Sequence, residues 1–318
     1  MKILVTGANG FVGTHLCEHL LRDGHHVVAA VRSPHTAPDQ TEELAYGDLL
    51  GPVDWTSALE GVHTVVHLAA RVHVMKDDSS DPAAEFRKTN VDGTMKLAMA
   101  AAAAGVRRFV YMSSIKVNGE RTQANHPFDA SSAPNPLDPY GASKWQAELA
   151  LTELAGSTGM TVICVRTPLV YGPGVRGNMA RLVRMASAGY PLPLGGIRNN
   201  RTMISVWNLA DLLASCSTAD GLSSGLVLAG DVHSPSTPEL YRELAAAVGR
   251  KPRTLNVPVA LLSALGRISG KSDVVSRLSD SLEVTTSSTI DGFDWTAPHS
   301  FQDGVRRFGS RWMKNGAR

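Results

Sequence analysis

The chain opens on Lys2-Ile-Leu-Val-Thr-Gly-Ala-Asn-Gly-Phe-Val-Gly13, and this stretch decides the fold. Its aliphatic beginning, closed by a glycine, predicts a short buried strand. Apolar side chains then recur at Val12, Leu16 and Leu20, which predicts an amphipathic helix over 11–21. A strand, a glycine turn and a helix in direct succession let backbone N–H groups and the helix N-terminus face a pyrophosphate. We therefore expect a dinucleotide-binding α/β fold.

Strand and helix patterns continue to alternate after this opening. Further buried strands are expected at 26–31, 63–68, 106–113 and 161–166. A long helical pattern covers 82–104, a loop covers 119–139, and a second helix follows at 140–155. Such alternation is typical of a Rossmann-type, doubly wound parallel sheet. We expect this sheet to carry a smaller mixed α/β C-terminal substrate domain.

The sequence also predicts how the chain divides. The dinucleotide-binding domain is expected at 1–166 plus about 203–231, and the substrate-binding region at about 167–202 plus 232–318. A short strand is expected at 203–206. Past Arg166 the pattern is richer in loops, which is why we expect the second region to be smaller and mixed.

Composition excludes several classes of partner. The formal charge of +2 comes from 31 basic and 29 acidic residues that are well mixed, so no basic stripe indicates nucleic acid. The longest apolar run, Leu97 to Ala104, is far too short to span a membrane. Only two residues precede the first strand, which leaves no room for a signal sequence. We expect a cytoplasmic protein with no nucleic-acid and no membrane partner.

The cysteines and nearby histidines predict no metal site. Cys17, Cys164 and Cys216 are far apart and lack CxxC spacing, which favours reduced thiols. His15 and His19 flank Cys17 on one side of the first helix, but no HExxH pattern is present. Because the apolar residues of that helix form its buried face, both histidines are expected on its polar side.

The end of the second strand bears on the choice of cofactor. NAD-specific folds of this kind carry an acidic side chain there, which binds the ribose hydroxyls. Here Val31 and Arg32 hold that place. A guanidinium favours a 2′-phosphate, so we expect NADP(H) over NAD(H); the alternative is that Arg32 is simply solvated.

A Tyr-x-x-x-Lys motif follows the proline-rich loop, in Tyr140-Gly-Ala-Ser-Lys144. On a helix this spacing places phenol and ammonium one turn apart on the same face. A nearby ammonium favours the phenolate, so we expect the pKa of Tyr140 to fall towards a useful range for proton transfer. The strand before the loop ends in Ser113-Ser114, at the edge where open α/β sheets bind ligands.

Together these motifs resemble the extended short-chain dehydrogenase/reductases. The resemblance rests on Gly7-x-x-Gly10-x-x-Gly13, Asp48, Ser114, Tyr140-x-x-x-Lys144 and Arg166-x-x-x-x-Tyr171-Gly-Pro. It points to the superfamily of nucleotide-sugar epimerases, dehydratases and reductases, and it covers nearly the whole chain. It implies that Tyr140 is the proton donor or acceptor, that Lys144 holds the nicotinamide ribose, and that Ser114 binds the reacting oxygen. Ser113 takes that role if the alignment is off by one.

The resemblance implies further binding residues. The expected cofactor contacts are Gly7, Asn9, Gly10, Phe11, Val12, Gly13, Arg32, Asp48, Leu49, Leu68, Ala69, Ala70, Asn90, Tyr140, Lys144 and Thr167. For a UDP-linked sugar, Arg201 matches the arginine that grips the diphosphate, with Arg277 as a second clamp and Asn178 nearby. Relatives pair into homodimers through the helices at 86–104 and 140–155, so a homodimer is expected.

Departures from the family pattern narrow the reaction. Dehydratases carry Asp-Glu after the catalytic Ser or Thr, whereas this chain has Ile115 and Lys116, which removes the elimination chemistry. A reductase or an epimerase remains. Segments 69–78 and 113–120 look similar to bacterial reductases of UDP-4-keto-6-deoxy-N-acetylhexosamine, and Val31-Arg32 favours an exchangeable NADPH.

The expected activity is therefore an NADPH-dependent 4-ketoreductase acting on UDP-2-acetamido-2,6-dideoxy-hexos-4-ulose. Its product would be UDP-N-acetylquinovosamine or the C4 epimer, for bacterial surface polysaccharide. The alternative is a UDP-hexose or UDP-N-acetylhexosamine 4-epimerase with tightly bound NAD. A third interpretation, a non-catalytic dinucleotide sensor on the same fold, is disfavoured by the intact Ser114, Tyr140 and Lys144 set.

Overall fold

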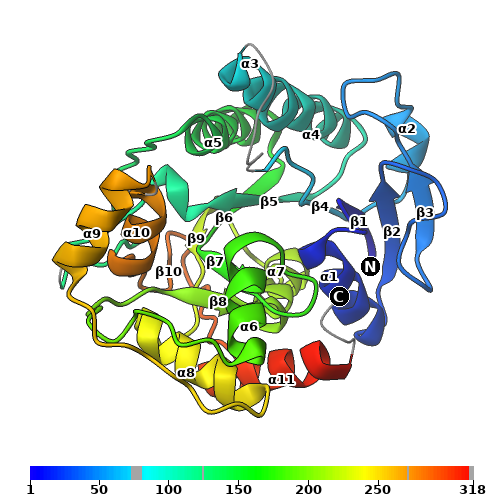
Figure 1. The fold of residues 1–318 in the computed structure, drawn as a ribbon. Coiled ribbons are helices and arrows are strands. Elements are labelled where there is room, and N and C mark those ends of the chain that lie inside the picture. The colour runs from blue at the N-terminus through cyan, green and yellow to red at the C-terminus, as the bar shows by residue number, and fades with distance from the viewer. Residues whose placement is uncertain (73–80, 124, 271, 315–318) are drawn as a thin grey trace.

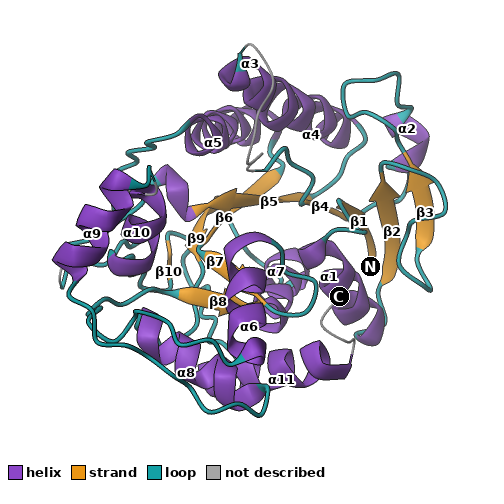
Figure 2. Cartoon of the chain, in the orientation of Figure 1, coloured by secondary structure: helices purple, strands orange, loops and turns teal. Residues whose placement is uncertain are grey.

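The computed structural model describes residues 1–72, 81–123, 125–270 and 272–314. Part of the segment that resembles the reductases, 73–80, lies outside the described residues. The sheet and its covering helices predicted from the sequence are present (Figures 1 and 2).

An eight-stranded sheet forms the centre of the fold, in the order β10-β9-β6-β5-β4-β1-β2-β3. Neighbouring strands are parallel, except that β10 runs antiparallel to β9. The strands are β1 Lys2–Thr6, β2 His26–Val31, β3 Glu42–Ala45, β4 Thr64–His67, β5 Arg108–Ser114, β6 Thr161–Thr167, β9 Gly225–Leu228 and β10 Ser287–Ser288. The strand order reverses at β1: β2 and β3 extend the sheet on one side of it, and β4, β5 and β6 extend it on the other. Ligands of such sheets bind at this point, beyond the carboxyl ends of the strands.

Helices cover both faces of the sheet (Figure 1). One face packs on α1 (Phe11–Arg22) and α7 (Val206–Thr218), whose apolar side chains join those of β1, β2 and β6 in one core. The other face packs on α2, α4 and α5 around a second core. The helical segments on that side and the turn after β5 are α2 Trp55–Ala58, α3 Pro82–Arg87, η1 Lys88–Asp92, α4 Gly93–Ala103, η2 Ile115–Val117 and α5 Pro139–Thr158.

The long helix expected over 82–104 is present over 82–103, but its hydrogen-bond pattern changes in the middle. A π-helical turn, η1, separates α3 from α4. The turn contains Asn90, whose buried side chain bonds the backbone of Arg71 and the hydroxyl of Ser143 on α5. Such π-turns often occur at functional sites, and no periodicity of apolar residues reveals them.

The C-terminal part builds a third core below the sheet. Its elements are β7 Leu169–Tyr171, α6 Gly177–Ala188, β8 Met203–Ser205, α8 Thr237–Ala247, α9 Val259–Ile268, α10 Ser272–Ser279 and α11 Phe301–Lys314. The strand expected at 203–206 is present as β8, but it pairs with β7 in a separate two-stranded sheet. The division into a dinucleotide domain and a substrate region stays a prediction. Among the described residues, no helix is long and apolar enough to cross a membrane.

Candidate functional site

The glycine turn after β1 is shaped so that only glycine fits. Gly7 has φ +66°, and its carbonyl accepts the N–H of Gly10 at 2.9 Å. A Cβ at Gly13 would lie 2.2 Å from the Gly7 oxygen and 2.8 Å from the Ala8 backbone. The turn and the first turn of α1 are therefore pressed together. This leaves a side-chain-free cradle at the helix N-terminus, the arrangement that accepts a pyrophosphate.

The end of β4 closes against the same turn. The Thr6 hydroxyl accepts the N–H groups of both Leu68 and Ala69 at 3.2 Å, and a Cβ on Gly7 would lie 3.0 Å from the Ala69 nitrogen. Ala70 follows in the same segment. Small residues therefore line the backbone where β4 meets the glycine turn, and their contact with a cofactor stays a prediction.

The residues expected around the adenosine lie in and after the loops that follow β2 and β3. Arg32 is exposed and hydrogen-bonds the side chain of Tyr46. Asp48 is exposed and accepts the N–H of Leu50 at 3.0 Å, whereas Leu49 is buried. The side chain of Asn9 donates to Thr36 at 3.0 Å. Arg32 is thus placed at the end of β2 with no acidic neighbour on that strand.

Tyr140 and Ser114 meet at the carboxyl end of β5. Tyr140 lies in the first turn of α5 and is half-buried, and its hydroxyl interacts with the Ser114 side chain. Burial raises the pKa of Tyr140 to about 12, while the hydrogen bond with Ser114 lowers it. The expected fall in this pKa is therefore not found. The Lys144 ammonium lies 6.0 Å from the centre of the Tyr140 ring, too far to outweigh burial.

Lys144 is a buried cation with few partners. Its ammonium donates to the Met112 carbonyl at 2.8 Å and lies 4.5 Å from the centre of the Tyr111 ring. Burial lowers the pKa of Lys144 to about 7, and the nearby Glu148 carboxylate opposes that fall. A lysine with such a pKa is half-protonated near neutral pH, as in many sites of proton transfer.

The two serines of β5 have different partners. Ser113 is buried and donates to Glu148, which also pairs with Arg166 at 2.6 Å. Arg166 donates in addition to Asn118 at 3.0 Å. Ser114, one residue on, is on the opposite face of the strand and interacts with Tyr140. This geometry favours Ser114 over Ser113 for a contact with substrate.

Ile115 and Lys116 stand where, by resemblance, dehydratases carry Asp and Glu. Neither of the two is placed as a free acid or base. Ile115 is buried in a small apolar cluster. The Lys116 ammonium binds Glu120 at 2.7 Å and also Asp138. Asp138 in turn caps α5 by accepting the Gly141 N–H at 2.7 Å. Lys116 therefore fixes the start of the helix that carries Tyr140.

The remaining predicted contacts fall into two groups. Asn90 lies beside α5, and Thr167 donates to the Ser113 carbonyl at 3.2 Å, so both border the Tyr140 region. Arg201 donates to the Asp280 carbonyl at 2.9 Å. Burial is the main cause that lowers the pKa of Arg201, and the nearby acids Asp280 and Glu120 oppose it. Arg277 adds a smaller lowering, so the two arginines proposed to clamp a diphosphate lie near each other. Asn178 is exposed in the first turn of α6 and has no hydrogen-bond partner among the described side chains.

A family model described as the NAD dependent epimerase/dehydratase family matches residues 3–221, which carry the glycine turn, Ser114, Tyr140 and Lys144. The chain belongs to this family. Its Rossmann-type fold and its membership of the extended short-chain dehydrogenase/reductases, both predicted from the sequence, are confirmed.

Three relatives cover almost the whole chain. A UDP-glucose 4-epimerase of Vibrio cholerae is 39% identical over 317 residues, which are 98% of this chain and 96% of that protein. N-acetyl-α-D-glucosaminyl-diphospho-ditrans,octacis-undecaprenol 4-epimerase of Escherichia coli O157:H7 is 28% identical over 94% of this chain and 89% of its own. The solved structure of MoeE5 in complex with UDP-glucose and NAD has 28% identity and a TM-score of 0.76, and covers 99% of both chains.

These relatives correct the expected reaction. The 4-ketoreductase prediction was wrong in its choice between two chemistries, because the Vibrio cholerae and Escherichia coli proteins, similar over nearly their whole length, are named 4-epimerases. The physical reason is that both chemistries use the same tyrosine, lysine and serine at C4. The sequence-based choice between them rested on Arg32 and on the similarity of segments 69–78 and 113–120 to reductases, and none of these distinguishes the two reactions. A nicotinamide dinucleotide cofactor and a UDP-sugar are supported by the relatives.

Sequence reasoning missed the buried pair Glu148–Arg166 and the bond between Lys116 and Asp138. The N-cap role of Asp138 could have been predicted, because an aspartate directly before Pro139 is typical of a helix start. The Glu148–Arg166 pair could not, since the two residues are brought together only by the packing of α5 on β6.

Proposed function

We propose that this protein is a UDP-hexose or UDP-N-acetylhexosamine 4-epimerase that holds its nicotinamide dinucleotide throughout the reaction. The observation that carries the proposal is the Ser114–Tyr140–Lys144 arrangement at the carboxyl edge of β5, with no carboxylate at positions 115 and 116. Full-length similarity to a UDP-glucose 4-epimerase supports the same conclusion.

Each side chain has a defined task in such a reaction. Tyr140 removes the proton from the C4 hydroxyl. It returns the proton to the same oxygen after the 4-keto sugar has rotated to present its other face. Ser114 donates a hydrogen bond to that oxygen, and Lys144 stabilises the phenolate through its charge. The dinucleotide, when bound, supplies a reversible hydride acceptor at C4. Burial raises the pKa of Tyr140 to about 12, so the hydrogen bond with Ser114, which lowers that pKa, favours the first proton transfer.

The cradle formed by Gly7, Gly10 and Gly13 fits the dinucleotide pyrophosphate. We keep the proposal that Arg32 binds a 2′-phosphate, so that NADP is preferred over NAD; the missing acid at the end of β2 supports it. Mass spectrometry of the nucleotide released from heat-denatured protein tests this preference. Recovery of NAD alone would contradict the role of Arg32 and leave the epimerase proposal standing.

Arg201 and Arg277 are the proposed clamp for the UDP diphosphate, with Asn178 beside it. Their closeness supports this assignment, because two guanidinium groups gain from sharing one dianion. Arg201 has no carboxylate side chain within ion-pair distance among the described residues, and its guanidinium donates to a backbone carbonyl.

The test of the reaction is interconversion without added cofactor. Purified protein is incubated with UDP-glucose or UDP-N-acetylglucosamine, and the C4 epimer is measured by NMR. Tyr140→Phe should lower turnover by roughly 10²-fold or more, as for loss of a positioned acid–base group. Tyr190→Phe, at an exposed tyrosine, is the control and should retain activity. Absence of the C4 epimer from both substrates, together with consumption of NADPH when a UDP-4-keto sugar is supplied, would overturn the epimerase proposal.

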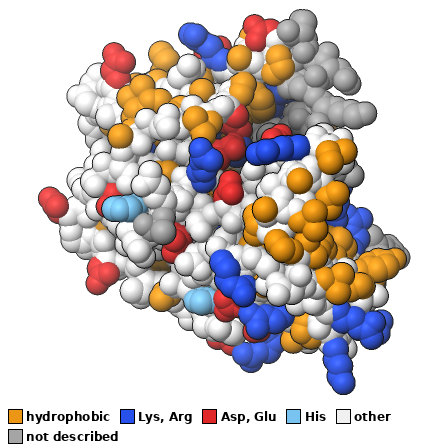
Figure 3. Space-filling model, turned by 60° about the vertical axis from the view of Figure 1, so that its left-hand side comes forward, with side chains coloured by type: hydrophobic (Ala, Val, Ile, Leu, Met, Phe, Trp, Pro, Cys, Tyr) orange, Lys and Arg blue, Asp and Glu red, His pale blue; other side chains and the backbone are white. Residues whose placement is uncertain are grey.

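A second candidate substrate is a polyprenyl-diphosphate-linked sugar. The observation that favours it is α9, a helix with mostly exposed apolar side chains that include Leu261, Leu265 and Ile268. Figure 3 brings the side of the molecule that carries α9 and α10 forward, and hydrophobic side chains gather there in patches among Lys and Arg. A relative that epimerises a sugar on undecaprenyl diphosphate supports this candidate. Faster epimerisation of a lipid-linked N-acetylglucosamine than of UDP-N-acetylglucosamine would select it.

We also propose a homodimer through α4 and α5. Met99 and Leu149, one on each helix, are exposed apolar side chains on these elements. Light scattering should give twice the 33.8 kDa chain mass for the wild type and the monomer mass for Leu149→Glu. A wild-type monomer would exclude the dimer.

A further inference from the structure

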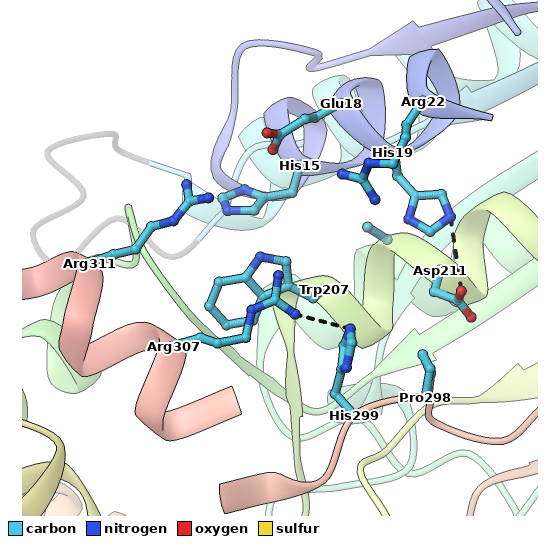
Figure 4. A pocket seen from close by; sticks show the side chains of 11 residues that line it. His15, Glu18, His19, Arg22, Trp207, Asp211, Pro298, His299, Arg307 and Arg311 are labelled. Carbon is cyan, nitrogen blue, oxygen red and sulfur yellow. Dashed lines mark hydrogen bonds and ion pairs between the residues drawn. The ribbon is translucent and has the colours of Figure 1, made fainter. Parts of the chain in front are cut away.

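A second polar cavity, of about 290 Å³, lies between α1, α7, α11 and the segment before α11 (Figure 4). Its basic lining residues are His15, His19, Arg22, His299, Arg307 and Arg311. The histidines of α1 lie on its polar side, as expected, and α7 and α11 partly cover them. The proposed epimerase site uses none of these residues.

Acidic side chains do not balance the guanidinium groups of the cavity. Two carboxylates line it, from Glu18 and Asp211. Asp211 already accepts the Trp295 indole N–H at 2.7 Å and lies 3.9 Å from His19. In the part of the chain that the structure describes, no carboxylate lies within 4.0 Å of the guanidinium nitrogens of Arg22, Arg307 or Arg311. The cavity therefore holds positive charge that its own acids leave uncompensated.

The position of Arg307 is fixed although it is crowded by like charge. Its guanidinium lies 4.3 Å above the Trp207 ring, and its NH1 is 3.0 Å from His299 Nε2. Burial, then Arg311 and Arg22, lower the pKa of Arg307. Burial is likewise the main cause that lowers the pKa of His15, and both Arg311 and Arg307 add to it. Preorganised cations that repel one another in a partly enclosed space bind an anion strongly, because the anion relieves the repulsion.

We propose that this cavity is a binding site for a small phosphate-bearing anion, held by Arg22 from α1 and by Arg307 and Arg311 from α11. Its volume suits inorganic phosphate or a short phosphorylated metabolite rather than a dinucleotide. The bound anion would join the first helix of the sheet domain to the last helix of the chain. It would thereby stabilise the folded protein by an amount that grows with the logarithm of its concentration above Kd.

The test is calorimetric titration of inorganic phosphate into the full-length wild type and three arginine variants. Arg22→Ala and Arg311→Ala should each weaken binding by roughly tenfold or more, since each removes charge-assisted hydrogen bonds. Arg306→Ala is the matched control: Arg306 is the neighbour of Arg307, but it is exposed and pairs with Asp303 at 2.9 Å. Its affinity should equal that of the wild type.

Two results would overturn the proposal. The first is that phosphate does not bind the wild type. The second is that it binds the wild type, Arg22→Ala and Arg311→Ala with equal affinity. Phosphate bound only at the glycine turn would give the second result, so the two sites are distinguished. Arg311→Lys keeps the charge and loses the planar fork, and it should bind with intermediate affinity even if Arg311→Ala folds poorly. No readout depends on epimerase activity, so failure of the proposed function leaves this test intact.

Discussion

Replacing Glu148 on α5 and Arg166 on β6, singly and together, should show how strongly the stability of the fold depends on this buried pair. Both side chains are almost inaccessible to solvent, with 5% and 3% of their side-chain surface exposed. Arg166 makes three nitrogen contacts to the Glu148 carboxylate, at 3.0, 3.2 and 2.6 Å, and a fourth bond to Asn118. Ser113 adds a donor to the same carboxylate. Each partner is thus fully satisfied only while the other is present.

The magnitude follows from this burial. Glu148→Leu leaves a buried guanidinium unpaired and should cost about 3–5 kcal/mol of the free energy of unfolding, and Arg166→Met should cost a similar amount. For a chain of this length, that corresponds to a fall in Tm of roughly 6–10 °C. The double variant replaces both charges by apolar groups. It should therefore be less destabilised than the sum of the single variants by about 2 kcal/mol or more.

Urea unfolding of the four proteins, followed by circular dichroism, measures the double-mutant cycle. Asp303→Asn provides the comparison, because Asp303 pairs with Arg306 at the surface and should leave the unfolding midpoint unchanged. Strictly additive losses in the double variant would refute the reasoning, since they would mean that Glu148 and Arg166 act independently.

Three further predictions concern the ends of α1 and α5. Burial lowers the pKa of Lys144 to about 7, so the unfolded chain binds its proton more tightly than the folded chain between pH 7 and the ordinary 10.5. Wild-type stability relative to Lys144→Met should therefore rise with pH in that window, by up to about 1.4 kcal/mol per unit, and a flat difference in thermal melts would contradict the burial. Gly13→Ala should cost roughly 1–3 kcal/mol, because its Cβ meets the Gly7 oxygen at 2.2 Å, whereas Gly156→Ala, with open space around it, should stabilise α5 in the same melts. Asp138→Ala should cost about 1–2 kcal/mol in urea unfolding and Asp138→Asn less, since asparagine still caps the helix; equal losses would show that the cap contributes little.

Local patterns predicted the sheet well. β1 and β2 match the expected ranges, and β4, β5 and β6 differ by only a few residues, because buried parallel strands are short aliphatic runs bounded by glycine or polar turns. The same reasoning did not predict the π-turn between α3 and α4. The π-turn is stabilised by the contacts of Asn90 with Arg71 and Ser143, which are distant in sequence.

Burial on helix faces was predicted less well. The apolar stripe of α1 gave its sheet-facing side correctly, but the flank with His15 and His19 is also partly covered. That cover comes from α7 and α11, far along the chain. The spacing of apolar residues in one helix indicates which face is most buried. It does not indicate whether another element packs against the polar residues.

The sequence predicted the positions of the site residues better than their pKa values. The spacing of Tyr140 and Lys144 correctly placed both on one face of α5, yet the pKa of Tyr140 rises because burial outweighs the distant ammonium. The choice of reaction likewise could not be inferred from these residues, because a reductase and an epimerase need the same groups around C4. The catalytic and binding roles stay predictions that the variants above test.

The bond between Lys116 and Asp138 has a consequence for how substrate preference could change. It joins the two ends of the loop that separates β5 from α5, so the anchor points of that loop stay fixed whatever lies between them. Closing a longer or shorter loop between fixed ends costs little, because the entropy of closure grows only slowly with length. A graft between Lys116 and Asp138 would leave the start of α5 in place, but it would have to keep Asn118, which binds Arg166, and Phe128, whose backbone bonds Glu283 and Thr285.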